Sequence, residues 1–208
     1  SDEMRYLRER MGLAGAEVLV MDVGTQGPAR FPADIGSEAV AAAGGVPLPM
    51  VRSCGDGHKV ISVMASGAGA LAARLHSEGR VDGLLSLGGA MGTHVALEVA
   101  AALPLGCPKV LLSTMAHSPL IAPQRITPDL IMMLWSGGLH GLNSLSRSAL
   151  SQAAGAVVGA CRSVERPLVE RPMVGITTLG QCCLRYTGTL KPALEARGYE
   201  VVVFHTTG

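Results

Sequence analysis

The sequence predicts an α/β protein with a Rossmann-like parallel sheet, helices on both faces of that sheet, and the start of a second α/β domain. Short continuous apolar runs, typical of strands buried on both faces, alternate along the 208 residues with longer segments of helical periodicity. Hydrophobic residues make up 48% of the chain but aromatic residues only 3%, so the core must be aliphatic. The 27 glycines favour tight turns and close backbone packing.

Helices are expected wherever apolar residues recur with the period of an α-helix. They span residues 2–11, 35–43, 58–78, 93–103 and 143–161. Apolar runs of strand length, bounded by glycine, proline or aspartate, predict strands at 16–23, 46–51, 81–87, 109–113 and 129–135. Thr93 and Asn143 each stand where a predicted helix begins, and we expect both to cap those helices; a ligand contact is the alternative for Asn143.

Two domains are expected, the first being a Rossmann-like nucleotide-binding domain over residues 1–165. The charged segment 162–171, which contains Pro167 and is followed by Pro172, predicts a linker. The second domain is expected over 172–208, as a βαβ unit with parallel strands at 173–177 and 200–204. One such unit cannot bury both faces of its strands, so we expect this domain to be truncated. We also expect a strand to precede the first helix, because an α/β domain rarely opens on a helix.

Composition excludes several classes of protein. The formal net charge is +1 and basic residues form no run, so nothing favours a nucleic-acid partner. No uncharged apolar stretch reaches the roughly 18 residues of a membrane span, and the charged opening residues do not resemble a signal peptide. The five cysteines follow no disulfide framework, which favours a reducing, cytoplasmic compartment. The histidines and cysteines lack metal-ligand spacing, so no metal site is expected.

The sharpest motif is a glycine loop between a predicted strand and a predicted helix, Gly88-Gly89-Ala90-Met91-Gly92-Thr93. Glycines let the backbone approach a ligand closely, and a helix N-terminus offers N–H groups and partial positive charge to an anion. We expect Gly88, Gly89, Gly92 and Thr93 to hold phosphate or carboxylate. The loop is neither a Walker A motif nor a GxGxxG motif. A turn that only lets the helix pack on the sheet is the alternative.

Polar residues at two other strand ends are further candidates. Asp22 and Gly24 follow the strand predicted at 16–23, where Asp22 either accepts a hydrogen bond from a ribose hydroxyl or caps a turn. Ser113 and Thr114 end the strand at 109–113 and are expected to line a ligand pocket. His117 lies close by, but without a GxSxG elbow or an identifiable third member the sequence defines no catalytic set.

The sequence resembles the ATP-binding family typified by the tomato mosaic virus resistance protein, whose members are mostly uncharacterised. The matching stretches are residues 84–93, 103–110, 112–116, 141–143 and 172–208, in the same order along nearly the whole chain. The resemblance implies two Rossmann-like domains in a protein of about twice this length, with ATP, alone or with magnesium, as the ligand. Ala90 and Met91 stand where the family pattern has serine and glycine.

Three functions follow as expectations. The first is ATP binding, with phosphates on the loop at 88–93 and Asp22, Gly24, Ser113 and Thr114 lining the rest of the site. The second is an enzyme acting on a small phosphorylated or carboxylated metabolite between the two domains, with Asp22 and His117 as the first residues to test. The third is a protein-interaction module. A homodimer is expected, with residues 136–142 and the helix at 143–161 against the second subunit.

Overall fold

A computed structural model describes residues 1–27, 31–135, 137, 140–165 and 170–205. The centre of the predicted linker, parts of the loops around 28 and 136–139, and the terminal residues 206–208 lie outside this range. The chain divides into two compact units, Ser1–Val164 and Glu165–Gly208. Each unit is described by itself.

The first unit is built on three parallel strands in the order β1-β2-β3. β1 (Leu84–Gly88) pairs with β2 (Lys109–Ser113), and β2 pairs with β3 (Leu130–Leu134). The central strand β2 is buried along its whole length. The three strands were predicted from their apolar runs, and the parallel α/β class is confirmed.

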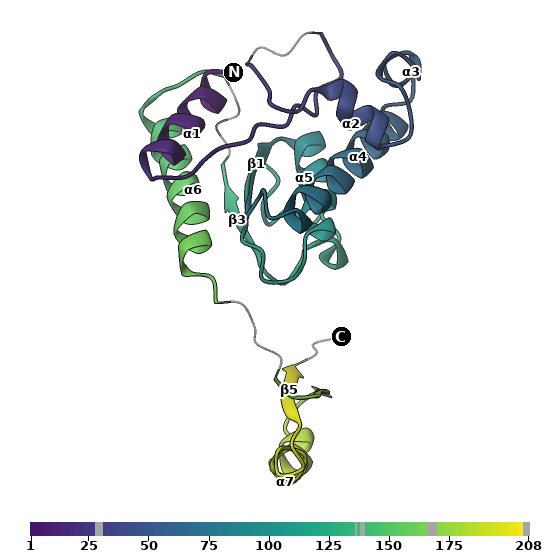
Figure 1. The fold of residues 1–208 in the computed structure, drawn as a ribbon, viewed down its shortest axis with the longest axis vertical. Coiled ribbons are helices and arrows are strands. Elements are labelled where there is room, and N and C mark those ends of the chain that lie inside the picture. The colour runs from purple at the N-terminus through teal and green to yellow at the C-terminus, as the bar shows by residue number, and fades with distance from the viewer. Residues whose placement is uncertain (28–30, 136, 138–139, 166–169, 206–208) are drawn as a thin grey trace. The chain divides into compact units, whose positions relative to one another are not determined.

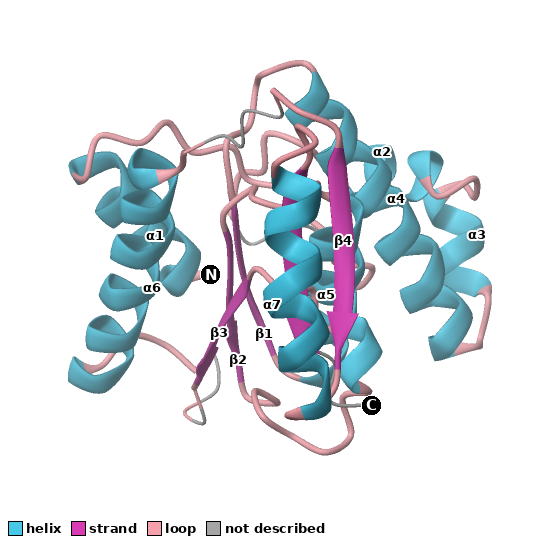
Figure 2. Cartoon of the chain, turned by 90° about the horizontal axis from the view of Figure 1, so that it is seen from below, coloured by secondary structure: helices cyan, strands magenta, loops and turns pink. Residues whose placement is uncertain are grey.

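Helices cover both faces of this sheet (Figures 1 and 2). On one face lie α2 (Ser37–Ala43), α3 (Leu48–Ser53), α4 (Gly57–Ser77) and α5 (Ala90–Ala102), whose buried side chains share one apolar cluster with Leu84 of β1. On the other face α1 (Asp2–Leu13) and α6 (Ser144–Ser163) pack side by side over Val110 and Leu112. The prediction that helices cover both faces of the sheet is therefore confirmed.

Glycines allow the helices of the first face to approach closely. A Cβ built on Gly67 of α4 would lie 1.9 Å from the carbonyl oxygen of Val40, and one on Gly44 would lie 2.2 Å from that of Val63. Neither position tolerates a side chain without moving α2 away from α4. The high glycine content is thus partly explained by helix packing and not only by turns.

Two of the predicted strands are wrong. Residues 46–51 contribute to the helix α3 instead, because Leu48 and Val51 are both buried at helical spacing and Pro47 and Pro49 stand at its start. The segment 16–23 forms a single bridge, between Met21 and Ile35, and no regular strand. Its side chains pack against the apolar clusters on the two faces of the sheet. Among the described residues, no strand lies beside it to form a regular pair.

Helix boundaries show one informative difference. α5 begins at Ala90 with Gly89 as its N-cap, so Thr93 lies inside the helix and the prediction that Thr93 caps it is wrong. By contrast, Asn143 does cap α6: its side chain accepts from the N–H of Ser146 at 2.9 Å, and the Ser146 hydroxyl accepts from the N–H of Asn143 at 2.8 Å. This reciprocal capping box confirms the predicted cap.

The second unit is a βαβ unit with parallel strands. β4 (Met173–Thr178) pairs with β5 (Glu200–His205), with Met173 opposite Glu200, and α7 (Cys182–Glu195) connects them. The predicted parallel pairing is confirmed.

A 3-10 turn, η1 (Pro123–Arg125), belongs to the first unit and packs on α5. Among the described residues, no helix combines the length and apolarity needed to cross a bilayer.

Candidate functional site

The glycine loop lies at the carboxyl end of β1, where the chain turns directly into α5. Gly88 is the last residue of β1 and Gly89 the N-cap of the helix. A Cβ built on Gly88 would lie 2.8 Å from Cα of Gly92, closer than a real Cβ approaches another atom. Gly88 is therefore required for the strand to meet the helix this tightly. A Cβ on Gly92 would meet its nearest atom, the Leu87 carbonyl oxygen, at an ordinary 3.4 Å.

The top of this turn faces outward. Gly89, Ala90 and Met91 are exposed, and the Met91 side chain is 66% exposed. The N–H of Thr93 donates to the Gly89 carbonyl at 2.8 Å and so makes the first bond of the helix. The N–H groups of residues 90–92 precede that bond and have no acceptor within the helix. Together with the helix dipole, they make this end of α5 suitable for an anion.

Thr93 and Ser113 hold the loop from beneath. Their hydroxyl oxygens lie 2.6 Å apart, and the two residues are 2% and 0% exposed. Ser113 Oγ also accepts from the N–H of Met115 at 2.8 Å, which fixes the turn after β2. Because both hydroxyls are buried and already paired, Thr93 and Ser113 position the loop.

Thr114 lies beside the outward part of the loop. Its N–H donates to the Gly88 carbonyl at 3.2 Å, and its Oγ1 lies 3.7 Å from where a Cβ on Gly89 would be. The structure thus brings six of the eight predicted site residues to one place at the carboxyl edge of the sheet: Gly88, Gly89, Gly92, Thr93, Ser113 and Thr114. Gly89 and Thr114 are the pair among them best placed to meet a ligand.

Asp22 and Gly24 form a turn of their own. Asp22 Oδ1 accepts from the N–H of Gly24 at 2.9 Å, and the N–H of Asp22 donates to the Ile35 carbonyl at 2.9 Å. This geometry matches the alternative in which Asp22 caps a turn. Within the described ranges, no hydrogen bond or ion pair connects either residue to the glycine loop. Their role as ligand contacts stays a prediction.

His117 follows β2 in an unusual conformation. It is exposed, and its φ of 63° makes it the one non-glycine residue in the described part of the chain with a positive φ. Histidine adopts this left-handed region more readily than most side chains, but at some energetic cost. The loop that follows β2 therefore holds a histidine in a strained backbone near the edge of the sheet where Ser113 and Thr114 lie.

A cation near the loop was not predicted. Arg125 of η1 donates from Nη1 to His94 Nδ1 at 3.2 Å, from Nη2 to the His94 carbonyl at 3.3 Å, and from Nη2 to Glu98 Oε1 at 3.0 Å. His94 lies one helical turn after the start of α5. Burial, and then the Arg125 charge, lower the pKa of His94 below its ordinary 6.5. Since 31 residues separate Arg125 from His94, no local pattern could have revealed the contact.

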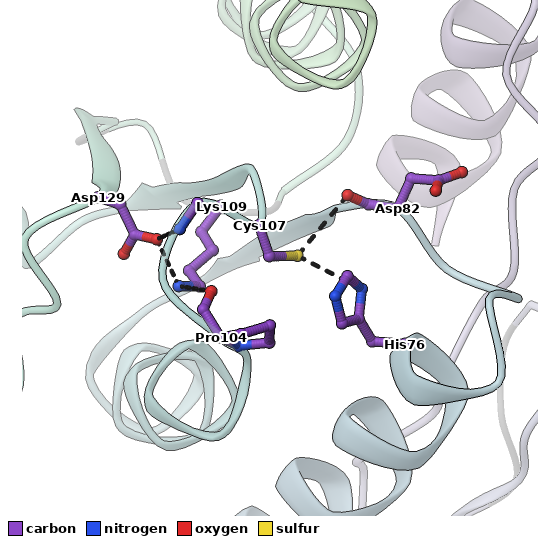
Figure 3. A network of polar contacts seen from close by, with 7 residues as sticks. His76, Asp82, Pro104, Cys107, Lys109 and Asp129 are labelled. Atoms are coloured by element: carbon purple, nitrogen blue, oxygen red, sulfur yellow. Dashed lines mark hydrogen bonds and ion pairs between the residues drawn. The ribbon is translucent and has the colours of Figure 1, made fainter. Parts of the chain in front are cut away.

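A second polar network lies at the start of β2, away from the carboxyl edge (Figure 3). Lys109, 1% exposed, donates from Nζ to Asp129 Oδ2 at 2.7 Å and to the Pro104 carbonyl at 2.9 Å. Burial opposes ionisation of Asp129, but the hydrogen bonds from Lys109 and from the Gly106 N–H outweigh it and lower the pKa. This network connects β2 with the entry to β3.

Cys107 occupies the same region and is not activated. Its Sγ donates to the Asp82 carbonyl at 3.6 Å and lies 3.8 Å from His76 Nδ1 (Figure 3). His76 Nδ1 is itself 2.8 Å from the Val81 carbonyl. Burial raises the pKa of this thiol, so it stays protonated. In the described part of the chain, no group of three or more His, Cys, Asp or Glu residues is arranged to hold a metal ion.

Comparison with known proteins identifies the family. The chain matches the model of the uncharacterised protein family UPF0261, N-terminal domain, over residues 1–166. A UPF0261 protein of Brucella suis biovar 1 is 47% identical over 208 residues, which is all of this chain and 50% of the relative. A UPF0261 protein of Clostridium tetani is 34% identical over 213 aligned positions, all of this chain and 51% of that protein.

A plant protein is similar over a shorter stretch. The ToMV susceptible protein tm-1(GCR26) of Solanum lycopersicum is 30% identical over 156 residues, which cover 72% of this chain and 20% of the tomato protein. The chain spans about half the length of the curated bacterial relatives it matches. It belongs to the UPF0261 family.

Proposed function

We propose that this member of the UPF0261 family binds the phosphate groups of a nucleotide at the glycine loop, with ATP as the first ligand to test. One observation carries the proposal. β1 ends in Gly88 and passes through Gly89 into the exposed start of α5, where the N–H groups of residues 90–92 precede the first helical bond and have no acceptor within the helix.

The roles of the individual residues follow from their placement. The N–H groups of Ala90, Met91 and Gly92 would donate to phosphate oxygens, and the Thr114 hydroxyl beside Gly89 would add a further donor. Thr93 and Ser113, buried and paired at 2.6 Å, would keep the loop in this conformation. Asp22 and Gly24 would line the remainder of the site, on the prediction made from their strand-end position.

Calorimetric titration of ATP with magnesium into the protein tests the proposal, with Gly89→Asp as the decisive variant. Aspartate is a favoured N-cap residue, so Gly89→Asp is expected to fold with wild-type or higher stability. Its carboxylate would occupy the N–H groups and repel phosphate, and binding should fall by at least about tenfold. The matched control is Gly155→Asp on the exposed side of α6, where a Cβ meets nothing within 4 Å.

The proposal fails if the wild-type protein gives neither heat nor a thermal shift at millimolar ATP. It also fails if Gly89→Asp and Gly155→Asp bind ATP equally well. A response to inorganic pyrophosphate but not to adenosine would assign the loop to phosphate recognition, with the base making little contribution to affinity.

A second candidate is an enzyme acting on a small phosphorylated or carboxylated metabolite, and His117 favours it. A strained, exposed histidine just beyond β2 is the kind of residue that function preserves against a backbone cost. His117→Gly removes the imidazole and relieves the positive φ, so it should raise stability while abolishing turnover of any substrate found. Full activity of His117→Gly would exclude this role.

We propose further that the protein is a cytoplasmic homodimer. The thiols of Cys54, Cys107 and Cys161 form no disulfide among the described residues, which supports a reducing compartment. Light scattering at two protein concentrations tests the dimer, and a monomeric mass at both would contradict it.

A further inference from the structure

A concave apolar groove lies between α3 and α4, apart from the residues of the glycine loop. Its cavity volume is about 510 Å³, within the range that holds a small organic ligand. Val46, Val51, Val60 and Val63 form part of its lining, and all four belong to or pack on the apolar cluster of this face of the sheet. Met50, 62% exposed, extends this apolar surface toward the solvent.

The groove has few polar groups, and these differ in charge. The other lining residues are Ser53, Cys54, Lys59 and Ser62. Of the described residues that line it, Lys59 alone carries a charge. The groove therefore combines an aliphatic wall with one cation on its solvent-exposed side.

The Lys59 ammonium is available to a ligand. Its nearest ion-pair partner is Asp56 Oδ2 at a long 3.9 Å, between side chains that are 75% and 43% exposed. The other oxygen of Asp56 accepts from the N–H groups of His58 and Lys59 as the N-cap of α4, so this carboxylate is fixed at the helix end. Such a solvated pair contributes little to stability, and an incoming anion can replace it at small cost.

We propose that this groove binds an amphiphilic monocarboxylate, with its aliphatic or aromatic chain along the valines and its carboxylate on Lys59. Burial of the chain would supply most of the affinity, because the walls are apolar. A single cation matches a monoanion better than a polyphosphate, which is why this ligand class differs from that of the glycine loop. The two sites are independent, and neither proposal rests on the other.

A macromolecular partner fits the groove less well. A stable protein interface buries on the order of 800 Å² on each partner and usually centres on a broad apolar patch. Here the apolar surface is concave and reaches the solvent chiefly at Met50. A small ligand that enters the cavity matches this shape better than a flat protein face.

Cys54 provides a built-in reporter of occupancy. It lines the groove and is exposed, whereas Cys107 is buried and Cys161 and Cys183 are half-buried. A ligand seated between α3 and α4 should slow alkylation of Cys54, measured peptide by peptide by mass spectrometry. The thiols of Cys107 and Cys161 in the same sample serve as internal controls.

The test compares octanoate with octanol and octylamine, three probes of equal chain length and different charge. We expect octanoate to bind saturably, to slow Cys54 alkylation severalfold, and to bind more tightly than octanol, while octylamine binds most weakly. Absence of heat and of Cys54 protection with octanoate would overturn the proposal. Equal binding of all three probes would also overturn it, since the charge of Lys59 would then play no part.

Two variants sharpen the result. Lys59→Met keeps the aliphatic stem and should weaken octanoate about fivefold while leaving octanol unchanged. Lys191→Met is the matched control, because Lys191 forms an exposed ion pair with Glu195 on α7, outside the groove. Ser62→Trp, made from an exposed serine of the lining, should fill the cavity and abolish both octanoate binding and Cys54 protection.

The outcomes separate the alternatives. Unchanged octanoate affinity in Lys59→Met, or protection of Cys54 that survives in Ser62→Trp, would contradict the proposed pose. Concentration-dependent self-association that Ser62→Trp abolishes, without any octanoate binding, would assign the groove to a second copy of the chain and overturn the ligand proposal.

Discussion

At the scale of single residues, the glycines of the loop differ in what they do. Gly88 is needed for packing, since a Cβ there would lie 2.8 Å from Cα of Gly92, while Gly92 itself has room for a methyl group. The sequence predicts both as phosphate contacts, because a glycine-rich loop has the same sequence pattern whether its glycines make room for a ligand or for a neighbouring backbone. Only the three-dimensional approach of α5 to β1 separates the two roles.

This difference gives the first prediction. Gly88→Ala should lower the free energy of unfolding by about 1–3 kcal/mol, because the added methyl group must push α5 away from the strand. Gly92→Ala should be neutral or stabilising by up to about 1 kcal/mol, because alanine favours the helix. Urea denaturation of both variants checks this, and equal destabilisation by the two substitutions would contradict the packing role assigned to Gly88.

The contact between His94 and Arg125 predicts a pH dependence of stability. The folded-state pKa of His94 lies below its ordinary 6.5, through burial and the Arg125 charge, so the unfolded chain takes up this proton first as the pH falls. His94 therefore adds no penalty above about pH 6.5 and destabilises the fold progressively as the pH falls from there toward the folded pKa.

Replacing His94 with glutamine should flatten the decline of stability between pH 7 and 5, because glutamine takes up no proton and retains an acceptor for Arg125. Denaturation midpoints of the wild type and His94→Gln across this interval provide the measurement. His140→Gln, in an exposed histidine outside the His94–Arg125 contact, is the control and should leave most of the decline in place. If the two variants flatten the curve equally, the His94–Arg125 contact is not its source.

At the scale of elements, the sequence predicts best where one local signal dominates. The fully buried strand β2 and the helix α6 with its Asn143 cap were both predicted, because an apolar run and a capping box are local patterns. The helix α3 was predicted as a strand since six residues between two turns have no clear period. The side chains of segment 16–23 have the apolar pattern of a buried strand. A strand also needs another strand to pair with, and the sequence of the segment does not specify one.

Lys109 at the start of β2 forms an ion pair with Asp129, which precedes β3. Removal of the Lys109 charge is therefore expected to lower the stability of the fold substantially. Lys109→Met leaves Asp129, whose side chain is 18% exposed, without its cation and should lower the free energy of unfolding by about 2–4 kcal/mol. The double variant Lys109→Met/Asp129→Leu also removes the carboxylate that has lost its cation, and it should recover at least half of the lost free energy of unfolding. Chemical denaturation tests both, and a double variant as unstable as the single one would show that the cost is one of packing.

At the scale of the whole molecule, the two units differ in how much core they possess. Ser1–Val164 holds the three-stranded sheet with apolar clusters on both faces, whereas Glu165–Gly208 holds two strands and one helix. A two-stranded unit is marginal by itself. We therefore predict that a fragment of residues 1–164 unfolds cooperatively, within about 5 °C of the melting temperature of the whole chain, as followed by calorimetry. A fragment that fails to fold would show that the first unit depends on the second.

Phosphate binding at the glycine loop would place a ligand at one edge of the larger unit. Amide NMR titration with ATP and magnesium detects such a ligand residue by residue. We expect saturable shifts that are largest at the N–H groups of residues 89–92 and at Thr114, and small at the start of β2 around Lys109. Absence of shifts at residues 89–92, or largest shifts elsewhere in the chain, would contradict phosphate binding at the glycine loop.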